Sequence, residues 1–452
     1  MTMGRETLLR HFHSLTTDLF LLYTQITMNF RKYQLKNGLR IILSPIKESK
    51  STTALVLVGT GSRYERKENN GISHFLEHMF FKGTKNRPKP QDVVSDLDAI
   101  GGEYNAFTSQ ECTGFWAKVS NHHLDVALNW LADILFHSKF SPREIEKEKG
   151  VVIEEINLYE DLPSRKIFHN WLHLLYGRQP LGWPVLGTKE NVKKINQKML
   201  LSYLQSQYQA TNTVLCLSGN LPSLSSVVKK ISKVFRFDST NEFCSPLKIK
   251  DTQKKPGVSV EYKKTDQSHL IVGFRGLDIN HPDQYALQLI STILGGYMSS
   301  RLFVEVREKR GLAYHISSVV EFFTDTGFIA ARAGVSNNRI EEAIKVILQE
   351  FKKIQKGNIS ITELNKAKEN LIGRLFLSLE SSDEIATWLA EQEVFRNKIL
   401  TPQQIANRIK KVELTDLKRV AREIFRPQRL NLAIIGPFKN REVFENILQD
   451  YA

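Results

Sequence analysis

Two histidines and a glutamate within five residues are the side chains of this chain best suited to chemistry. They are His74, Glu77 and His78, in the order H-x-x-E-H. On an α-helix, residues three and four positions apart share a face, so both imidazoles could bind one metal ion with the carboxylate beside it. This is the geometry of a hydrolytic zinc site, although an ordinary helix with two hydrogen-bonded histidines would have the same spacing.

The residues around this motif predict a mostly buried helix. Apolar side chains recur at positions 72, 75, 76, 79 and 80, and Gly83 follows the last of them. This spacing predicts a helical apolar stripe that ends at Gly83. A buried helix with three polar groups must satisfy them, and a divalent metal ion is one way to do so.

The chain also consists of two related halves. Strand-like segments at residues 54–58 and 213–217 begin and end the first half, and segments at 270–274 and 430–435 do the same in the second. An offset of about 215 residues superposes both pairs, which indicates that one α/β unit has been duplicated.

The second copy serves as an internal control for the motif. At the same offset, the three motif positions fall near Leu289, Thr292 and Ile293, in a segment that keeps the apolar stripe and lacks every metal-binding side chain. The polar trio is therefore not needed for the stability of this fold.

Helical periods alternate with short β-branched strands within each half. We expect an α+β fold of two homologous halves, each a mainly antiparallel sheet packed with helices. The boundaries we expect are a zinc-binding half at 29–240, a polar, Pro-containing linker at 241–257 and a metal-free half at 258–452. Residues 1–28 are expected to be an extra segment outside the fold, with Met28 as the working initiator.

Composition excludes several classes of function. The 452 residues include 41% hydrophobic and 25% charged side chains, as in ordinary globular proteins. No apolar run approaches the ~20 residues of a membrane helix, so we expect no membrane span. The net charge of +15 is dispersed among acidic side chains without a nucleic-acid motif, so we expect no nucleic-acid partner.

The cysteines indicate the compartment. Cys112, Cys216 and Cys244 are odd in number and show no C-x-x-C spacing. A disulfide framework is not expected, and a reducing compartment such as the cytoplasm fits this pattern best. The alternative is an organellar matrix, if residues 1–28 act as a presequence.

Four separated motifs resemble those of one family. They are the segments 70–84 around the H-x-x-E-H motif, 101–108, 148–156, and 299–303 continuing into Arg307 and Tyr314. In their order and approximate spacing, over about residues 29 to 450, the chain resembles the pitrilysin/insulinase family of zinc metallopeptidases. The resemblance is closest to the mitochondrial-processing-peptidase-like branch of that family.

A zinc site needs a third protein ligand and one open position. In the helical segment 142–157, Glu148 and Glu155 are seven residues apart and therefore share a face. The resemblance implies that Glu155 is the ligand and that Glu148 orients a histidine N–H. Glu154, about 100° around the helix, is the competing candidate for the ligand.

The resemblance implies a zinc-dependent endopeptidase with one Zn²⁺ per chain. The metal would activate water, and Glu77 would take up the proton as general base. Arg307 and Tyr314 of the second half would reach toward the substrate. Their role rests on the resemblance alone, because an arginine on a helix and a tyrosine on a strand are usually structural.

Substrate and partners follow from the same set of motifs. Segment 101–108 is predicted to be an exposed edge strand to which an extended peptide could add, with Asn105, Ala106 and Phe107 near the substrate. The net charge of +15 favours general peptides over basic presequences.

The presence of both the zinc motif and the Arg307/Tyr314 pair in one chain favours a homodimer. The alternative function is a catalytically silent or assembly subunit of a larger complex, although such relatives typically lose a ligand or the base.

Overall fold

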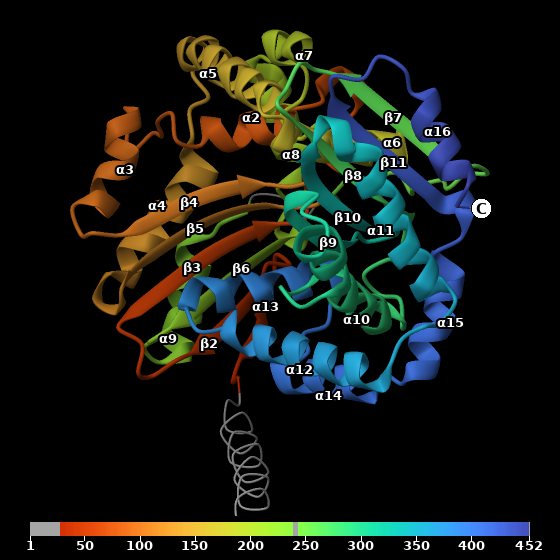
Figure 1. The fold of residues 1–452 in the computed structure, drawn as a ribbon. Helices are drawn as coiled ribbons and strands as arrows, with labels where there is room; N and C mark the ends of the chain where they lie inside the picture. Colours follow the sequence, from red (N-terminus) through yellow and green to blue (C-terminus); the bar gives the residue numbers. More distant parts are fainter. Residues whose placement is uncertain (1–27, 238–242, 452) are drawn as a thin grey trace, which may run out of the picture.

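The computed structural model describes residues 28–237 and 243–451, which form two sheets covered by helices (Figure 1). The expected extra segment at residues 1–28 lies, up to residue 27, outside the described residues.

The first sheet has six strands in the order β1-β2-β6-β3-β5-β4. All neighbours are antiparallel except β2 and β6, which are parallel. The strands are β1 (Arg31–Gln34), β2 (Arg40–Pro45), β3 (Ser51–Val58), β4 (Glu103–Thr108), β5 (Thr113–Ser120) and β6 (Thr213–Gly219).

The second sheet has five strands in the order β7-β11-β8-β10-β9, with only β7 and β11 parallel. The strands are β7 (Gly257–Tyr262), β8 (Gln267–Arg275), β9 (Ala313–Phe322), β10 (Gly327–Ser336) and β11 (Leu430–Gly436). Apart from β1, the two sheets have the same strand order and the same directions. The predicted α+β fold with two similar, mainly antiparallel halves is therefore confirmed.

Helices pack on both sheets. In the first half they are α2 (Ile72–Met79), α3 (Pro90–Asp98), α4 (Leu124–His137), α5 (Pro142–Asp161), α6 (Pro163–Tyr176), α7 (Lys189–Lys194), α8 (Gln197–Gln207) and α9 (Leu224–Val234). In the second half they are α10 (Gln284–Gly295), α11 (Ile340–Gln355), α12 (Ile361–Leu377), α13 (Ser382–Arg396), α14 (Pro402–Lys411), α15 (Leu414–Ile424) and α16 (Glu442–Gln449).

The halves exchange one helix each. Helix α6, from the first half, packs on β7, β8 and β11 of the second sheet, where Trp171 and Leu175 meet Ile271 and Phe328. Helix α13, from the second half, packs on β2, β3 and β6 of the first sheet (Figure 1). Each central strand is thus covered on both faces, which explains why these strands are almost continuously apolar.

Strand β3 shows this two-sided burial. Ala54, Val56 and Val58 face the first-half helices, whereas Leu55 and Leu57 face α13. Successive side chains of a strand point to opposite faces, so the two sets belong to different hydrophobic cores. The interface between the halves is therefore part of the core of each.

A buried ion-pair cluster also joins the halves. Arg63 of the first half pairs with Glu111 and, at 2.6 Å, with Asp325 of the second half. Glu111 in turn accepts a hydrogen bond from the Thr324 hydroxyl at 2.6 Å. Opening the halves would leave these charges unpaired, which is costly for buried groups.

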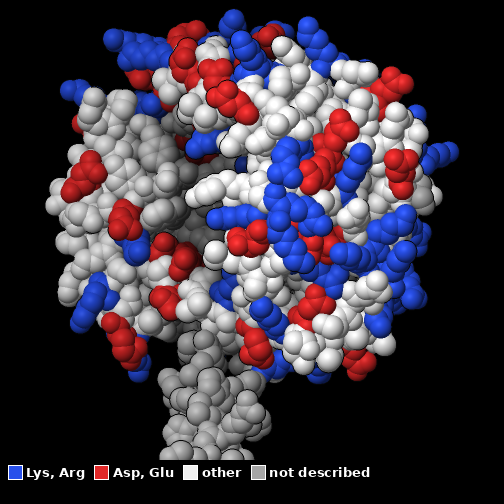
Figure 2. All heavy atoms as spheres, in the orientation of Figure 1, with Lys and Arg blue, Asp and Glu red and all other residues white. Residues whose placement is uncertain are grey.

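A cavity of about 490 Å³ lies between the halves. Phe107 of β4, Glu321 of β9 and Trp388 of α13 are among the residues that line it. Figure 2 shows the molecular surface hollowed between the halves, with acidic and basic side chains on the rim. Strands β4 and β9, each at the edge of its sheet, therefore border the space between the halves.

Among residues 28–237 and 243–451, no helix has the length and apolarity needed to cross a membrane.

Candidate metal centre

Helix α2 brings the two histidines of the motif together. His74 and His78 lie one turn apart, with ring centroids 4.6 Å from each other and ring planes at 61°. The apolar residues Ile72, Phe75 and Met79 bury the opposite face of the helix. Packing of the apolar stripe thus fixes the direction in which the imidazoles point.

The helix is shorter than the apolar stripe predicted. It ends at Met79, not at Gly83. The amides of Phe81 and Lys82 bond to carbonyls three residues back, each at 3.2 Å, which tightens the chain into turns. Gly83 then has a φ of +111°, which ends the segment.

Glu65 fixes the beginning of α2. Its carboxylate accepts hydrogen bonds from the amides of Gly71 and Ser73 and from the Asn70 side chain, each at 2.8 Å. Gly71 has a φ of +100°, and a Cβ there would lie 2.7 Å from the Leu186 carbonyl oxygen. A negative group at a helix N-terminus satisfies free amides and complements the helix dipole.

Sequence reasoning missed Glu65. It lies six residues before Gly71 and is separated from the helix by a short turn. This spacing matches no capping-box pattern, so nothing in the sequence indicates the contact.

Helix α5 supplies the third candidate ligand. The Glu155 Oε2 atom lies 3.5 Å from His74 Nε2 and 3.5 Å from His78 Nε2. One ligand atom from each of these three side chains lies within 4.8 Å of the other two. The competing candidate, Glu154, is exposed and does not belong to this cluster.

Glu148 lies behind the cluster. Its Oε1 atom is 2.8 Å from His78 Nδ1, and its Oε2 atom is 2.7 Å from Lys82 Nζ. A carboxylate on Nδ1 directs the other ring nitrogen, Nε2, toward Glu155. Glu148 is only 3% exposed, and its pairs with His78 and Lys82 offset the free-energy cost of burying its charge.

The pKa values of the two imidazoles are shifted in opposite directions. Burial, together with the neighbouring His78, lowers the pKa of His74 to about 4. Burial opposes the shift at His78, but Glu148 and Glu155 raise the pKa of His78 to about 9. The Nδ1 atom of His74 is buried and has no hydrogen-bond partner among the described residues.

Glu77 lies beside the cluster without belonging to it. Its Oε2 atom accepts a hydrogen bond of 2.5 Å from the Thr108 hydroxyl, at the end of strand β4. Burial raises the pKa of Glu77, and the bond from Thr108 only partly opposes this. A carboxyl group with a raised pKa is suited to accept and return protons near neutral pH.

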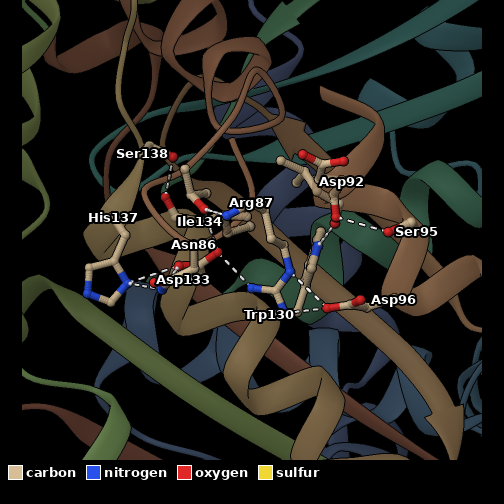
Figure 3. Close-up of polar contacts among 12 residues, drawn as sticks. Asn86, Arg87, Asp92, Ser95, Asp96, Trp130, Asp133, Ile134, His137 and Ser138 are labelled. Atoms are coloured by element: carbon tan, nitrogen blue, oxygen red, sulfur yellow. Dashed lines mark hydrogen bonds and ion pairs between the residues drawn. The ribbon is translucent and has the colours of Figure 1, made fainter. Parts of the chain in front are cut away.

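The loop after α2 is held by a separate polar network (Figure 3). Buried Asp133 on α4 accepts hydrogen bonds from Thr84 at 2.6 Å, Asn86 at 2.5 Å and Arg87 at 2.7 Å. Arg87 also pairs with Asp96 on α3 at 2.6 Å. Burial works against ionisation, but these donors lower the pKa of Asp133. The network anchors the chain that leaves α2.

Arg307 and Tyr314 lie together in the second half. Arg307 is in a short π-helix at Phe303–Glu308, and its guanidinium carbon lies 5.0 Å from the centroid of the Tyr314 ring. Tyr314, at the start of edge strand β9, is 80% exposed. Among the described residues, neither has a hydrogen bond or ion pair with the histidines or Glu155.

The predicted substrate strand is an edge strand. Strand β4 pairs only with β5, so its other edge has no strand partner within the described chain. Asn105 is exposed, and Ala106 and Phe107 are partly buried. Thr108 of the same strand contacts Glu77, so a peptide added along β4 would run toward the cluster.

The residues present fit a zinc ion. Two imidazole nitrogens and one carboxylate oxygen converge, which is the usual protein ligand set of catalytic zinc with an open position. The carboxylate behind His78 is the usual supporting contact of a metal-binding histidine.

Comparison with known proteins gives two family matches. Residues 40–189 match the model described as insulinase (peptidase family M16), and residues 194–371 match the model described as peptidase M16 inactive domain. The candidate ligands His74, His78 and Glu155 all lie within the first matched segment.

Similar proteins are known from bacteria. An uncharacterized zinc protease, YmxG, of Bacillus subtilis (strain 168) is 37% identical over 91% of this chain and 99% of its own length. An uncharacterized zinc protease of Streptomyces coelicolor is 32% identical over 91% of this chain and 90% of its own length. The crystal structure of a protease from Helicobacter pylori superposes with a TM-score of 0.85 at 26% identity, covering 91% of this chain and all of that one.

Proposed function

We propose that this chain, which belongs to the insulinase (M16) family of peptidases, is a zinc-dependent endopeptidase of extended peptides or small unfolded polypeptides. The observation that carries the proposal is the convergence of His74, His78 and Glu155 on one point, with the Glu77 carboxylate beside them.

His74, His78 and Glu155 would hold the metal ion. When bound, zinc would act as a Lewis acid that lowers the pKa of a bound water to about 7 and stabilises negative charge on a carbonyl oxygen. Glu148 keeps the His78 ring oriented through its contact with Nδ1.

Glu77 is the proposed general base. Its carboxylate takes the proton from the attacking water and returns it to the leaving amine. The Thr108 hydroxyl holds this carboxylate in place and links it to the strand along which the peptide would lie.

The peptide is proposed to bind along β4, next to Asn105, Ala106 and Phe107. Backbone hydrogen bonds to an edge strand bind many sequences with little selectivity. Arg307 and Tyr314 would donate hydrogen bonds to the substrate from the other half. Their contribution at a developing oxyanion would be about 3 to 4 kcal/mol in favourable cases.

Several finer points remain part of the proposal. They are one Zn²⁺ per chain, a homodimer, a cytoplasmic location and membership of the mitochondrial-processing-peptidase-like branch. The presence of both the zinc motif and the Arg307/Tyr314 pair in one chain favours a homodimer over an obligate heterodimer.

The test is metal analysis combined with a peptide-cleavage assay. The purified full chain is expected to contain about one zinc per chain, to cleave a quenched fluorescent peptide and to lose cleavage with a chelator. Added zinc should restore cleavage. A folded chain that binds zinc and cleaves no peptide of an unbiased library would instead be a silent or assembly subunit.

A further inference from the structure

A second cavity, of about 690 Å³, begins one residue beyond Glu155. Its wall includes Ile156 and Tyr159 of α5, Arg165 and His169 of α6, and Trp183 of the following loop, and we call it the Arg165 cavity. Tyr159 follows Glu155 by one helical turn and therefore lies on the same side of α5. A peptide held at the metal-binding residues would pass this cavity within a few residues of the cleaved bond.

Two carboxylates in the wall of the Arg165 cavity already have cationic partners. Glu160 pairs with Lys189 at 2.7 Å. Glu261 pairs with Lys166 at 2.7 Å and also accepts a hydrogen bond from Asn170 at 2.7 Å. A third carboxylate, Glu190, is exposed to solvent. Both lysines of the wall are therefore already paired with acidic side chains.

Arg165 differs from these lysines. Arg165 is exposed at the rim of the cavity, and its guanidinium carbon lies 5.2 Å from the centroid of the Tyr159 ring. Besides the hydrogen bond with His78, the charge of Arg165 contributes to lowering the pKa of Glu155, but no carboxylate of the described residues lies within ion-pair distance of Arg165. A guanidinium offers several N–H donors in a planar fork that matches the two oxygens of a carboxylate. The Arg165 guanidinium can therefore still bind an anionic group of a ligand in the cavity.

His169 supplies a second polar group. It follows Arg165 by four residues on α6, and its Nε2 atom is buried without a hydrogen-bond partner among the described residues. Burial lowers the pKa of His169 to about 4, so the ring is neutral near pH 7. A neutral imidazole can donate one hydrogen bond to a carboxylate oxygen and accept another from an N–H group.

Apolar side chains complete the cavity. Ile156, Phe168 and the Trp183 ring contribute to its wall. The Trp183 ring is held by a 3.0 Å hydrogen bond from its Nε1 to the Arg178 carbonyl. Apolar walls with a few convergent polar groups are typical of ligand pockets.

We propose that the Arg165 cavity is a substrate subsite that binds a carboxylate of the peptide, with Arg165 as the residue that determines this specificity. The inference rests on the proposed endopeptidase function, which brings a peptide to Glu155. The carboxylate is either an Asp or Glu side chain or the C-terminus of a short peptide. The net charge of +15 also favours acidic substrates over basic ones.

The test uses pairs of quenched peptides that differ in one charge. In C-terminally amidated peptides, Glu is compared with Gln and Lys at each position on both sides of the cleaved bond. Wild-type kcat/KM should favour Glu over Gln by about 5- to 20-fold at one position. A second arm compares a free C-terminal carboxylate with its amide in the Gln peptides, which distinguishes the two sources of the carboxylate.

Variants of the full chain assign the preference to Arg165. Arg165→Glu should abolish the preference for the carboxylate and favour Lys at the same position. Arg143→Glu is the matched control, because this substitution changes the charge by the same amount. Arg143 lies in the first turn of α5, at the end of the helix away from the Arg165 cavity. This control should keep the wild-type preference.

Binding separates failure of the subsite from failure of the enzyme. The Glu77→Gln variant is titrated with the same labelled peptides, and fluorescence anisotropy gives each Kd. Tighter binding of the carboxylate peptide, lost with Arg165→Glu, supports the subsite even if the wild type cleaves nothing. Equal binding and equal cleavage of all charge variants, or an unchanged preference in Arg165→Glu, would overturn it.

Discussion

Helices α2 and α10 occupy equivalent places in the two halves and differ in what they carry. α2 packs against β4, α5 and α8, and α10 packs against the corresponding β9, α12 and α15. Where α2 has His74, Glu77 and His78, α10 has the buried residues Leu289, Thr292 and Ile293. The same scaffold thus occurs twice in this chain, once with a cluster of candidate metal ligands and once with Leu289, Thr292 and Ile293 in their place.

The next helices repeat the contrast. Aligned on their N-cap serines, Ser141 and Ser360, helices α5 and α12 place Ala367 where Glu148 stands and Arg374 where Glu155 stands. Ala367 is fully buried, and Arg374 donates a hydrogen bond to the Gly296 carbonyl at 2.8 Å. The second half therefore buries an apolar group where the first half buries Glu148, and it has an exposed arginine in place of Glu155.

The comparison of the two halves shows which side chains the fold does not need for packing. Buried polar groups destabilise a fold unless they are paired, and apolar groups of similar volume often stabilise it. Because the second half folds without the polar set, the first half keeps that set at a cost in stability. The proposed metal binding by His74, His78 and Glu155 would account for this cost.

Copying the second half into the first gives the largest expected effect. The double variant His74→Leu/His78→Ile should contain no zinc, and its peptide cleavage should fall to the chelator-treated background. A triple variant that also carries Glu148→Ala leaves no buried carboxylate without its His78 partner. Its thermal midpoint, measured without metal, should equal or exceed that of the metal-free wild type. Surviving zinc-dependent cleavage would show that α2 is not the metal-binding helix.

Removing only the base should lower turnover without releasing the metal. Glu77→Gln is expected to reduce kcat by about 100- to 10,000-fold, because the amide cannot accept the proton from water. Zinc content should stay at the wild-type value. Glu154→Gln, on the exposed side of α5, is the control and should keep full activity. Loss of zinc from Glu77→Gln would contradict the role of Glu77 as the base and would indicate that it is a metal ligand.

Arg307 tests what the second half contributes. Arg307→Ala should lower kcat/KM by up to about 100- to 1,000-fold if its guanidinium stabilises the oxyanion. Bound zinc should not change, because Arg307 has no contact with the three ligand side chains. Lys309→Ala, two residues further along the chain, is the control. Equal activity of the two variants would limit the role of Arg307 to packing.

Glu148 tests the supporting contact. Glu148→Ala copies Ala367 of the second half and should weaken zinc binding by about 10- to 100-fold, because the His78 ring loses its orienting partner. Competition with a zinc chelator measures the affinity. Glu146→Ala, exposed on the same helix, should bind zinc as the wild type does.

Glu65 is expected to have the smallest effect on chemistry. Glu65→Ala removes the acceptor of three donors at the start of α2 and should lower the free energy of unfolding by about 1 to 3 kcal/mol. Denaturant unfolding measures this free energy. The control is Glu68→Ala at an exposed position, and its free energy of unfolding should lie within about 0.5 kcal/mol of the wild-type value. An unchanged stability would mean that packing alone positions α2.

The parts of the fold that could be predicted are those with local patterns. The spacing of His74, Glu77 and His78 and the apolar stripe beneath them are properties of one helix, and the duplicated strands recur at one offset. Glu148 and Glu155, seven residues apart on one continuous helix, could be placed on one face from the sequence, but only the resemblance to the family favoured Glu155 over Glu154 as the ligand. The structure brings that face to the imidazoles.

The parts that could not be predicted depend on distant contacts. The bond from Thr108 to Glu77 and the cap from Glu65 join segments whose approach depends on tertiary packing. The exchange of α6 and α13 leaves no local pattern either, because a helix is equally amphipathic whichever sheet it covers. Helix α2 ends early, at Met79, because the chain tightens into turns while the apolar run continues. The spacing of apolar residues alone does not predict where this change occurs.

The most direct test of the central claim is anomalous diffraction at the zinc absorption edge from crystals of the zinc-loaded full chain. The account predicts one strong peak per chain, with His74 Nε2 and His78 Nε2 at about 2.0 to 2.1 Å and a Glu155 oxygen at about 2.0 to 2.2 Å. A crystal with zinc bound elsewhere and Glu155 turned away from the imidazoles would contradict it.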